Sequence, residues 1–124
     1  MDRKELQGRT KKFHVDVIKL CSDFPKNAAG FETAKQLIRA AGSVGANYRA
    51  TARAKSNADF IYNIEIVLEE ADESHYWLEV IKEAEIKIGI EVDRLINEAN
   101  QLTAIFAATD KTAKTNKIKK MSDV

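Results

Sequence analysis

Two histidines, one cysteine and a run of acidic residues are the groups that could carry catalytic chemistry in this chain of 124 residues. A carboxylate-bridged pair of metal ions in a helical bundle needs two Glu-x-x-His pairs on separate helices and two further glutamates. The chain has one comparable pair, Asp72-x-x-His75, because the other histidine, His14, has Lys11 three residues before it. The ligand set is incomplete, so we predict no metal, no cofactor and no enzymatic activity.

Nucleophilic catalysis is the second chemistry to consider. Ser43, His75 and Asp72 are the residue types of a hydrolase triad, but no nucleophile-elbow sequence surrounds Ser43, and a serine within a helix lacks an oxyanion hole. Cys21 and His14 lie seven residues apart, which is about 10 Å along a helix and too far for activation. We therefore predict no catalytic residues, a structural role for Ser43 and a hydrogen-bonded His75 that is either in the core or semi-buried.

Basic side chains are the one feature that could bind nucleic acid. Residues 1–55 hold 12 Lys and Arg against 5 Asp and Glu, residues 56–110 hold 3 against 13, and residues 111–124 hold 5 against 1. This segregation indicates either a charged partner or basic and acidic faces that pair between antiparallel helices. Phosphate contacts need clustered cations, and those that we predict to contact nucleic acid are Arg39, Arg49, Arg53, Lys55, Arg9 and Lys12. Further cations are Lys11, Lys111, Lys114, Lys117, Lys119 and Lys120, and no alternation of aromatic and basic residues predicts base stacking.

Four helices must position these groups. The chain is rich in helix-forming residues and has one proline and five glycines, which is a helical composition. Apolar spacing predicts helices over Arg3–Asp23, Phe31–Ala54, a third from Ser56 to about Ala84, and a fourth through Ile88, Val92, Leu95, Ala99, Leu102 and Phe106. We predict an all-α, up-down-up-down antiparallel four-helix bundle over residues 1–110, followed by a Lys-rich flexible tail over residues 111–124.

Nothing in the sequence resembles a membrane or export segment. No apolar run reaches the roughly 20 residues that a membrane span needs, and the first residues lack the apolar region of a signal peptide. The single Cys21 cannot form an internal disulfide, which suits a reducing compartment. We expect no membrane partner and a cytoplasmic location.

The third predicted helix has apolar residues on two opposite faces. One face holds Phe60, Ile64, Leu68, Ala71, His75 and Leu78 and is predicted to join the core, together with Phe13, Leu37, Leu95 and Leu102 from the other helices. The other face holds Tyr62, Ile66, Trp77 and Val80. A monomeric bundle can bury only one of the two faces, and an exposed apolar stripe usually marks a contact surface. We therefore predict that the second face is an oligomer interface.

Several small and polar residues have predicted structural roles. Ser56 begins a capping box and should accept a hydrogen bond from the backbone N–H of Asp59. Asn47 lies four residues after Ser43, so both point to one face, where we expect a buried hydrogen-bond link between helices. Gly42 and Gly45 each cost a helix about 1 kcal/mol relative to alanine. Either a neighbouring backbone approaches them closely or the helix is broken there.

The acidic side of the third helix repeats like charges. Glu65, Glu69 and Glu73 are spaced by four residues, which destabilises an isolated helix by a few tenths of a kcal/mol per pair. Two interpretations remain open. The glutamates form a solvated acidic face, or cations from the second helix relieve the repulsion, and in that case Glu73 has a structural role.

Part of the sequence resembles a known family. The run Ser43-Val44-Gly45-Ala46-Asn47, then Arg53, Ser56 to Phe60 and Ala71-Asp72-Glu73-Ser74, resembles the signature of bacterial four-helix bundle proteins encoded by intervening sequences in 23S rRNA genes (S23 ribosomal protein-like). Accessory variability proteins of diversity-generating retroelements are similar. The resemblance covers roughly residues 6 to 113. Such proteins often carry a Glu-Gly pair where this chain has Ala50 and Thr51.

The resemblance implies a homo-oligomeric ring of five subunits and an association with RNA or with a reverse transcriptase or ribonucleoprotein. Two hypotheses for function follow. In the first, the chain is a non-enzymatic oligomeric bundle that binds structured RNA or a nucleoprotein through its basic surface. In the second, it is a structural protein–protein interaction scaffold with no nucleic-acid role. A bundle enzyme ranks third.

Overall fold

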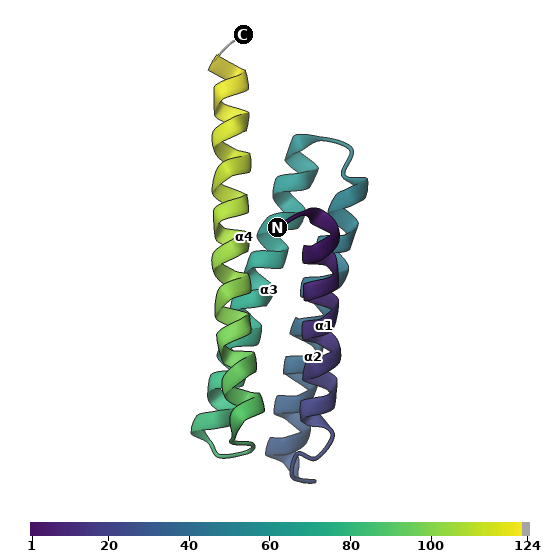
Figure 1. Cartoon of the computed structure of the whole chain (residues 1–124), viewed down its shortest axis with the longest axis vertical. Coiled ribbons are helices and arrows are strands. Elements are labelled where there is room, and N and C mark those ends of the chain that lie inside the picture. Colours follow the sequence, from purple (N-terminus) through teal and green to yellow (C-terminus); the bar gives the residue numbers. More distant parts are fainter. Residues whose placement is uncertain (123–124) are drawn as a thin grey trace.

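The computed structural model describes the backbone of residues 1–122 and the side chains of residues 1–116. Its helices are α1 (Arg3–Cys21), α2 (Ala28–Ala50), α3 (Asn57–Glu83) and α4 (Ile90–Ser122), and the short 3₁₀ turn η1 (Thr51–Arg53) follows α2. Successive helices run in opposite directions (Figure 1). The predicted all-α four-helix bundle is therefore confirmed.

Short polar side chains begin the first three helices. Asp2, Asn27 and Ser56 each accept a hydrogen bond from the backbone N–H three residues further along, at 2.8, 2.9 and 3.1 Å respectively. These bonds satisfy donors that an uncapped helix would leave free, and the predicted cap at Ser56 is present. The turn before α4 instead uses positive φ angles, 57° at Glu85 and 126° at Gly89.

The core lies between all four helices. The predicted core residues Phe13, Leu37, Ile64, Leu95 and Leu102 are all buried. Leu68 is only half-buried, so its predicted burial was wrong, although it still packs against the core. Ile88, predicted as the first apolar residue of the fourth helix, is exposed and precedes α4.

The buried face of α3 differs from the predicted one. The buried residues are Ile61, Ile64, Val67, Ala71, Ser74, Leu78 and Ile81, whereas Phe60, Leu68 and His75 are half-buried. From Ile64 onward the spacing alternates between three and four residues, which is the 3.5-residue repeat of helices that coil around one another. The predicted face assumes a straight helix with 100° per residue. Over the 27 residues of α3, the small difference from a 3.5-residue repeat adds up, so the prediction selects residues next to the buried ones, such as Phe60 in place of Ile61.

The glycines of α2 lie against α1. The helix continues without interruption through Gly42 and Gly45, so the predicted alternative of a break is wrong. A Cβ atom at Gly45 would lie 3.6 Å from the carbonyl oxygen of Thr10, and one at Gly42 would lie 2.9 Å from Nε2 of His14. The close backbone approach is confirmed at Gly45, while at Gly42 the neighbour is a side chain.

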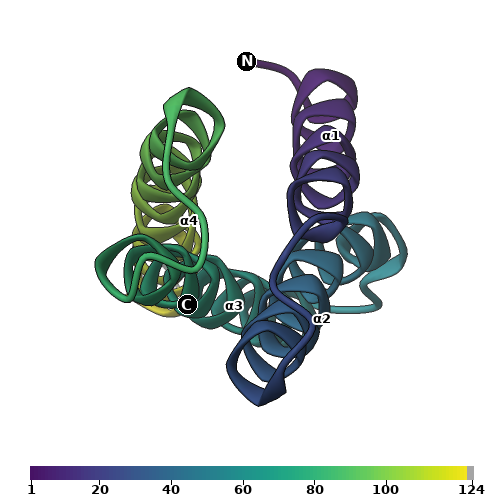
Figure 2. The ribbon, with the colours of Figure 1, turned by 90° about the horizontal axis from the view of Figure 1, so that it is seen from below.

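Helix α1 touches α4 less than it touches α2, its neighbour in sequence. Seen from below, the four helices form a curved row in which α1 and α4 are the two ends (Figure 2). Charged side chains bridge these ends: Arg9 bonds to Glu98 at 2.7 Å, and Arg94 bonds to Asp16 at 2.9 Å. The contact between α1 and α4, which closes the bundle, is therefore stabilised in part by ion pairs.

Helix α4 is longer than the sequence predicts. We expected the bundle to end near Asp110, but α4 continues to Ser122 and projects past the other helices (Figure 1). Ala113 is buried, and Nζ of Lys114 lies 3.0 Å from carboxylate oxygens of both Asp110 and Glu65. These contacts stabilise the additional turns of the helix. In addition, no glycine or proline follows Gly89 to interrupt it. The side chains of Lys117, Lys119 and Lys120 lie outside the described residues.

None of the helices in the described chain carries an apolar stretch long enough to cross a bilayer.

Candidate nucleic-acid interface

The elbow between α2 and α3 is organised around Thr51. Its buried hydroxyl donates to the carbonyl oxygen of Tyr48 at 2.6 Å. The Thr51 hydroxyl oxygen also accepts a hydrogen bond from Nη2 of Arg3. The Arg3 guanidinium lies 5.1 Å from the centre of the Tyr48 ring. The start of α1 is thereby tied to the end of α2. Thr51 occupies one of the two positions where the sequence departs from the Glu-Gly pair of similar proteins.

Three of the predicted nucleic-acid contacts surround this elbow. Arg49, Arg53 and Lys55 are exposed, and none of them forms an ion pair with another side chain in the described part of the protein. The capped start of α3 at Ser56 and the turn η1 hold their backbone in place. Their charges face solvent and are available for phosphate.

The other three predicted contacts have acidic partners within the chain. Arg39 pairs with Glu73 at 2.5 Å and with Glu70 at 3.3 Å. Arg9 binds Glu98, and Lys12 lies 2.9 Å from Asp16. For these residues the pairing of basic with acidic faces accounts for the charge segregation, so the unpaired basic surface is smaller than the predicted set.

Glu73 joins α2 to α3. Its carboxylate accepts from Arg39 and also from Nε1 of Trp77 at 3.2 Å. The hydrogen bond from Arg39 holds the pKa of Glu73 below its usual value, so Glu73 is ionised at neutral pH. Burial raises the pKa of the neighbouring Glu70, although Arg39 opposes this shift. One cation of α2, Arg39, thus relieves part of the repulsion along the acidic face.

Asn47 does not link two helices. Its Nδ2 donates to the carbonyl oxygen of Ser43 at 2.9 Å and to the Ser43 hydroxyl at 2.8 Å. Both bonds lie within α2, so the predicted link between helices was wrong. Residues four apart on a helix are near neighbours, and α1 meets this part of α2 through the backbone of Thr10 at Gly45.

The outer face of α3 carries two exposed tyrosines. Tyr62 is 67% exposed and Tyr76 is 57% exposed, whereas Ile66 and Val80 are half-buried. Trp77 was predicted to lie on this face, but it is half-buried and packs against the core. Tyr76, which stacks edge-on against Trp77 with ring centres 5.2 Å apart, is the exposed aromatic residue that the sequence reasoning missed.

The residues considered for catalysis have ordinary surroundings. Nδ1 of His75 lies 3.0 Å from the Glu79 carboxylate one turn away. Burial raises the pKa of the Cys21 thiol to about 11, with a further contribution from Asp23, so the thiol is protonated at neutral pH. Across the described residues, no three His, Cys, Asp or Glu side chains gather closely enough to hold a metal ion.

Arg3 is a second residue that the sequence reasoning missed. It lies outside the predicted basic set, yet it is the cation that fixes the elbow through Thr51 and Tyr48. The signal in the sequence was weak, because one arginine at the start of a helix has no periodic partner. The spatial proximity of residues 48 positions apart follows from the up-down topology.

The comparisons with known proteins agree with the fold. Residues 4–108 match the family model described as "23S rRNA-intervening sequence protein". A crystal structure of a protein of unknown function from the S23 ribosomal protein family of Bacteroides thetaiotaomicron is similar, with a TM-score of 0.80 and 28% sequence identity. The similarity covers 90% of this chain and 99% of that one. No curated protein matches the chain.

Proposed function

The chain belongs to the family of 23S rRNA-intervening sequence proteins, and on that premise we propose that it is a non-enzymatic, oligomeric protein that binds structured RNA. The observation that carries this proposal is the cluster of Arg49, Arg53 and Lys55, three exposed cations without acidic partners among the described side chains. A cation that is paired with a carboxylate must break that ion pair before it can bind phosphate. Arg49, Arg53 and Lys55 have no such pair to break among the described side chains. We place this activity in the cytoplasm.

The topology adds further cations to the same end of the bundle. Helix α1 begins there, α2 ends there, α3 begins there and α4 ends there (Figure 1). Lys4 and Lys111 are exposed on this end. The acidic residues Asp2, Glu5 and Asp59 are exposed nearby, so a single subunit offers only a weakly basic surface.

Self-assembly would raise the affinity of such a surface. We propose that copies associate through the outer face of α3, with five subunits as the expected number. Weak contacts repeated around a ring gain avidity when one RNA can reach several copies. Contacts with phosphate alone would give little sequence preference and a steep loss of affinity with salt. The RNA could also belong to a ribonucleoprotein, such as one that contains a reverse transcriptase.

A salt titration with charge-reversal variants tests this function. The wild-type protein and an Arg49→Glu/Arg53→Glu variant are titrated into labelled structured RNA, including fragments of rRNA, at several salt concentrations. We expect the variant to bind at least about tenfold more weakly, with a salt slope lower by about two. Lys19→Glu/Lys26→Glu is the matched control, because it makes the same charge change at the opposite end of the bundle.

The second candidate function is a protein scaffold without RNA. The exposed Tyr62 and Tyr76 favour it, since exposed apolar surface on a helix marks a protein contact. If wild-type protein binds RNA no better than a neutral control protein at physiological salt, the scaffold is the better interpretation. Equal losses in the two double variants would also contradict a specific basic end.

A further inference from the structure

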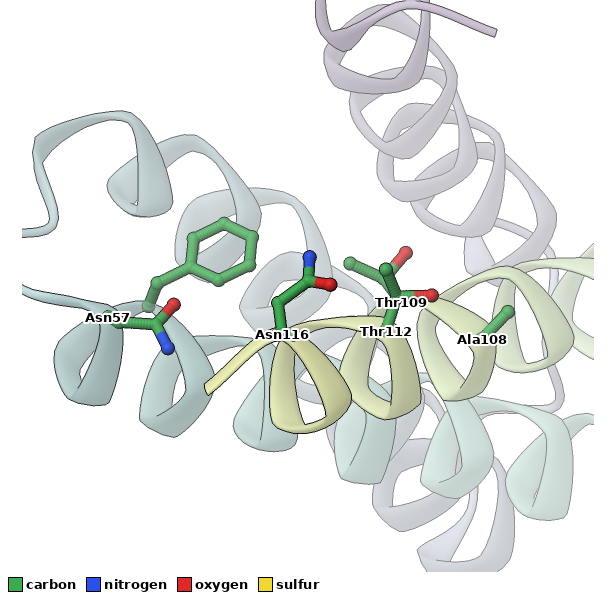
Figure 3. A pocket seen from close by; sticks show the side chains of 7 residues that line it. Asn57, Ala108, Thr109, Thr112 and Asn116 are labelled. Atoms are coloured by element: carbon green, nitrogen blue, oxygen red, sulfur yellow. The ribbon is translucent and has the colours of Figure 1, made fainter. Parts of the chain in front are cut away.

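A groove of about 430 Å³ lies between the start of α3 and residues 108–116 of α4 (Figure 3). It is lined by Asn57 and Phe60 of α3 and by Ala108, Thr109, Thr112, Ala113 and Asn116 of α4. The labelled side chains of Asn57 and Asn116 reach it from the two different helices (Figure 3). The groove adjoins the elbow, because Asn57 is only two residues after Lys55.

The short length of α1 leaves this groove open. Arg9 of α1 bonds to Glu98 and Gln101 of α4, and the two helices run in opposite directions. With equal rise per residue in both helices, Arg3 lies level with about residues 104 to 107 of α4. The groove begins at Ala108, just past the point where α1 stops covering the neighbouring side of α4.

The groove has the chemistry of a site for a nucleobase. Among the described side chains, residues 1–116, no charged residue lines it. Asn57 and Asn116 are exposed, and each amide offers donors as well as an acceptor, which is what the edge of an unpaired base requires. Phe60 contributes an aromatic ring, the usual stacking partner of a base in single-stranded RNA.

The surrounding charges suit the phosphates of such a strand. Arg53 and Lys55 precede Asn57 in the sequence, and Lys111 precedes Thr112. All three cations are exposed and adjoin lining residues in the sequence, and so does one exposed acid, Asp59 before Phe60. A base in the groove would therefore place its backbone close to positive charge.

A helix from a second copy fits this groove less well. Helices that dock into grooves insert large apolar anchors into apolar pockets. Here every lining side chain except Phe60 is small, so the groove has no deep apolar pocket for such an anchor. The observations favour a flat, polar-edged ligand.

We propose that this groove binds one unpaired base of a single-stranded RNA segment, with Phe60 as stacking partner and Asn57 and Asn116 at the base edge. The inference rests on the proposed function and refines it. Structured RNA would then be bound through phosphates at the elbow and through a loop or bulge base in the groove.

The test compares three probes of equal length: a short single-stranded RNA, the same strand without bases, and its duplex. We expect the wild-type protein to prefer the single strand over the strand without bases by about tenfold, the effect of one stacked base. Asn116→Ala should remove most of this preference. Phe60→Leu should do the same while retaining an apolar side chain, since Phe60 packs against the core.

Asn100→Ala is the matched control, because Asn100 is an exposed asparagine of α4 that lines a different groove with His75 and Asp93. Equal binding of the strands with and without bases would overturn the inference. Unchanged binding in both groove variants would overturn it as well. If Arg49→Glu/Arg53→Glu weakened binding in that case, the proposed RNA-binding function would remain supported without a base site in the groove. A shift of oligomeric state in the groove variants, measured by light scattering, would instead identify the groove as a contact between copies. No binding of any probe, or of structured RNA, would remove both proposals.

Discussion

Arg9 of α1 donates two parallel hydrogen bonds to Glu98 of α4, Nε to Oε2 at 2.8 Å and Nη2 to Oε1 at 2.7 Å. The same Nη2 also donates to Oε1 of Gln101 at 2.7 Å. Paired hydrogen bonds of this geometry between arginine and a carboxylate are directional and stronger than a single contact. They join the first and last helices of the bundle, where packing contacts are fewest among neighbouring helices.

Replacing Arg9 should therefore loosen the closure of the bundle. We expect Arg9→Ala to lower the free energy of unfolding by about 1 kcal/mol, the upper end for a partly exposed pair. Arg9→Lys should recover only part of this loss, because lysine cannot form both bonds. Urea denaturation monitored by circular dichroism measures the difference.

Lys12→Ala is the control for this pair. Lys12 also pairs with an acidic residue, but its side chain is much more exposed than that of Arg9, so its loss should cost less than about 0.5 kcal/mol. Equal effects of the two alanine substitutions would show that the geometry of the Arg9–Glu98 pair contributes nothing.

The register of α3 can be tested with two leucines on the same helix. Leu78 is fully buried and Leu68 is half-buried. Leu78→Ala should cost about 2–5 kcal/mol of unfolding free energy because it leaves a cavity, and Leu68→Ala should cost less than half as much. Denaturant titration gives both values, and a larger cost at Leu68 would restore the face that the sequence periodicity predicts.

The limits of the sequence reasoning differ between fold and surface. The four helices, most of the predicted core positions and the cap at Ser56 follow from the spacing of apolar residues and from polar residues at the helix ends. Both are patterns within short stretches of sequence. The choice between Phe60 and Ile61, or between Leu68 and Val67, depends on how strongly the helices coil around one another, and that is set by the neighbours. The end of α4 was missed because its last contacts, such as Lys114 with Glu65, come from a different helix.

The pairing of cations shows the same limit. Arg39 and Arg49 are both arginines on α2, and nothing in their spacing distinguishes them. The fold places Arg39 beside Glu70 and Glu73, while it leaves Arg49 at the elbow without an acidic neighbour among the described side chains. Which positive charges are available to a partner is therefore a property of the assembled bundle.

Two glycines of α2 should respond in opposite ways to alanine. A Cβ at Gly30 would lie 1.9 Å from the carbonyl oxygen of Pro25, so Gly30→Ala must displace the loop between α1 and α2 and should cost about 1–3 kcal/mol. A Cβ at Gly45 would meet Thr10 at 3.6 Å, an ordinary contact. Gly45→Ala should be neutral or stabilise the protein by up to about 1 kcal/mol.

Thermal and urea denaturation of the two glycine variants provides the comparison. The same substitution in the same helix cancels most of the effect of helix propensity. A large loss at Gly45 would mean that α1 lies closer to α2 than the structure places it.

Cys21 should be a slow nucleophile. Burial raises its pKa to about 11, and only the thiolate is alkylated. At pH 8 we expect iodoacetamide to react with the native protein roughly two hundred times more slowly than with a free cysteine of ordinary pKa near 8.5. The rate should rise about tenfold per pH unit until the pH approaches 11. Protein unfolded in urea is the control, and equal rates in the native and unfolded states would contradict the burial of the thiol.

The outer face of α3 should mediate self-association. Tyr62 and Tyr76 are the large exposed side chains on it. The half-buried Ile66 lies one turn after Tyr62, and the half-buried Val80 lies one turn after Tyr76. We expect wild-type protein to be oligomeric in light scattering at tens of micromolar and Tyr62→Glu/Tyr76→Glu to shift it toward monomer, because the new charges would be buried without partners. Trp77→Ala is a poorer probe, since Trp77 packs against the core and its loss should also lower stability. Phe31→Glu is the control, as Phe31 is an equally exposed aromatic residue at the start of α2. A monomeric wild type, or dissociation caused by Phe31→Glu instead, would place the interface elsewhere.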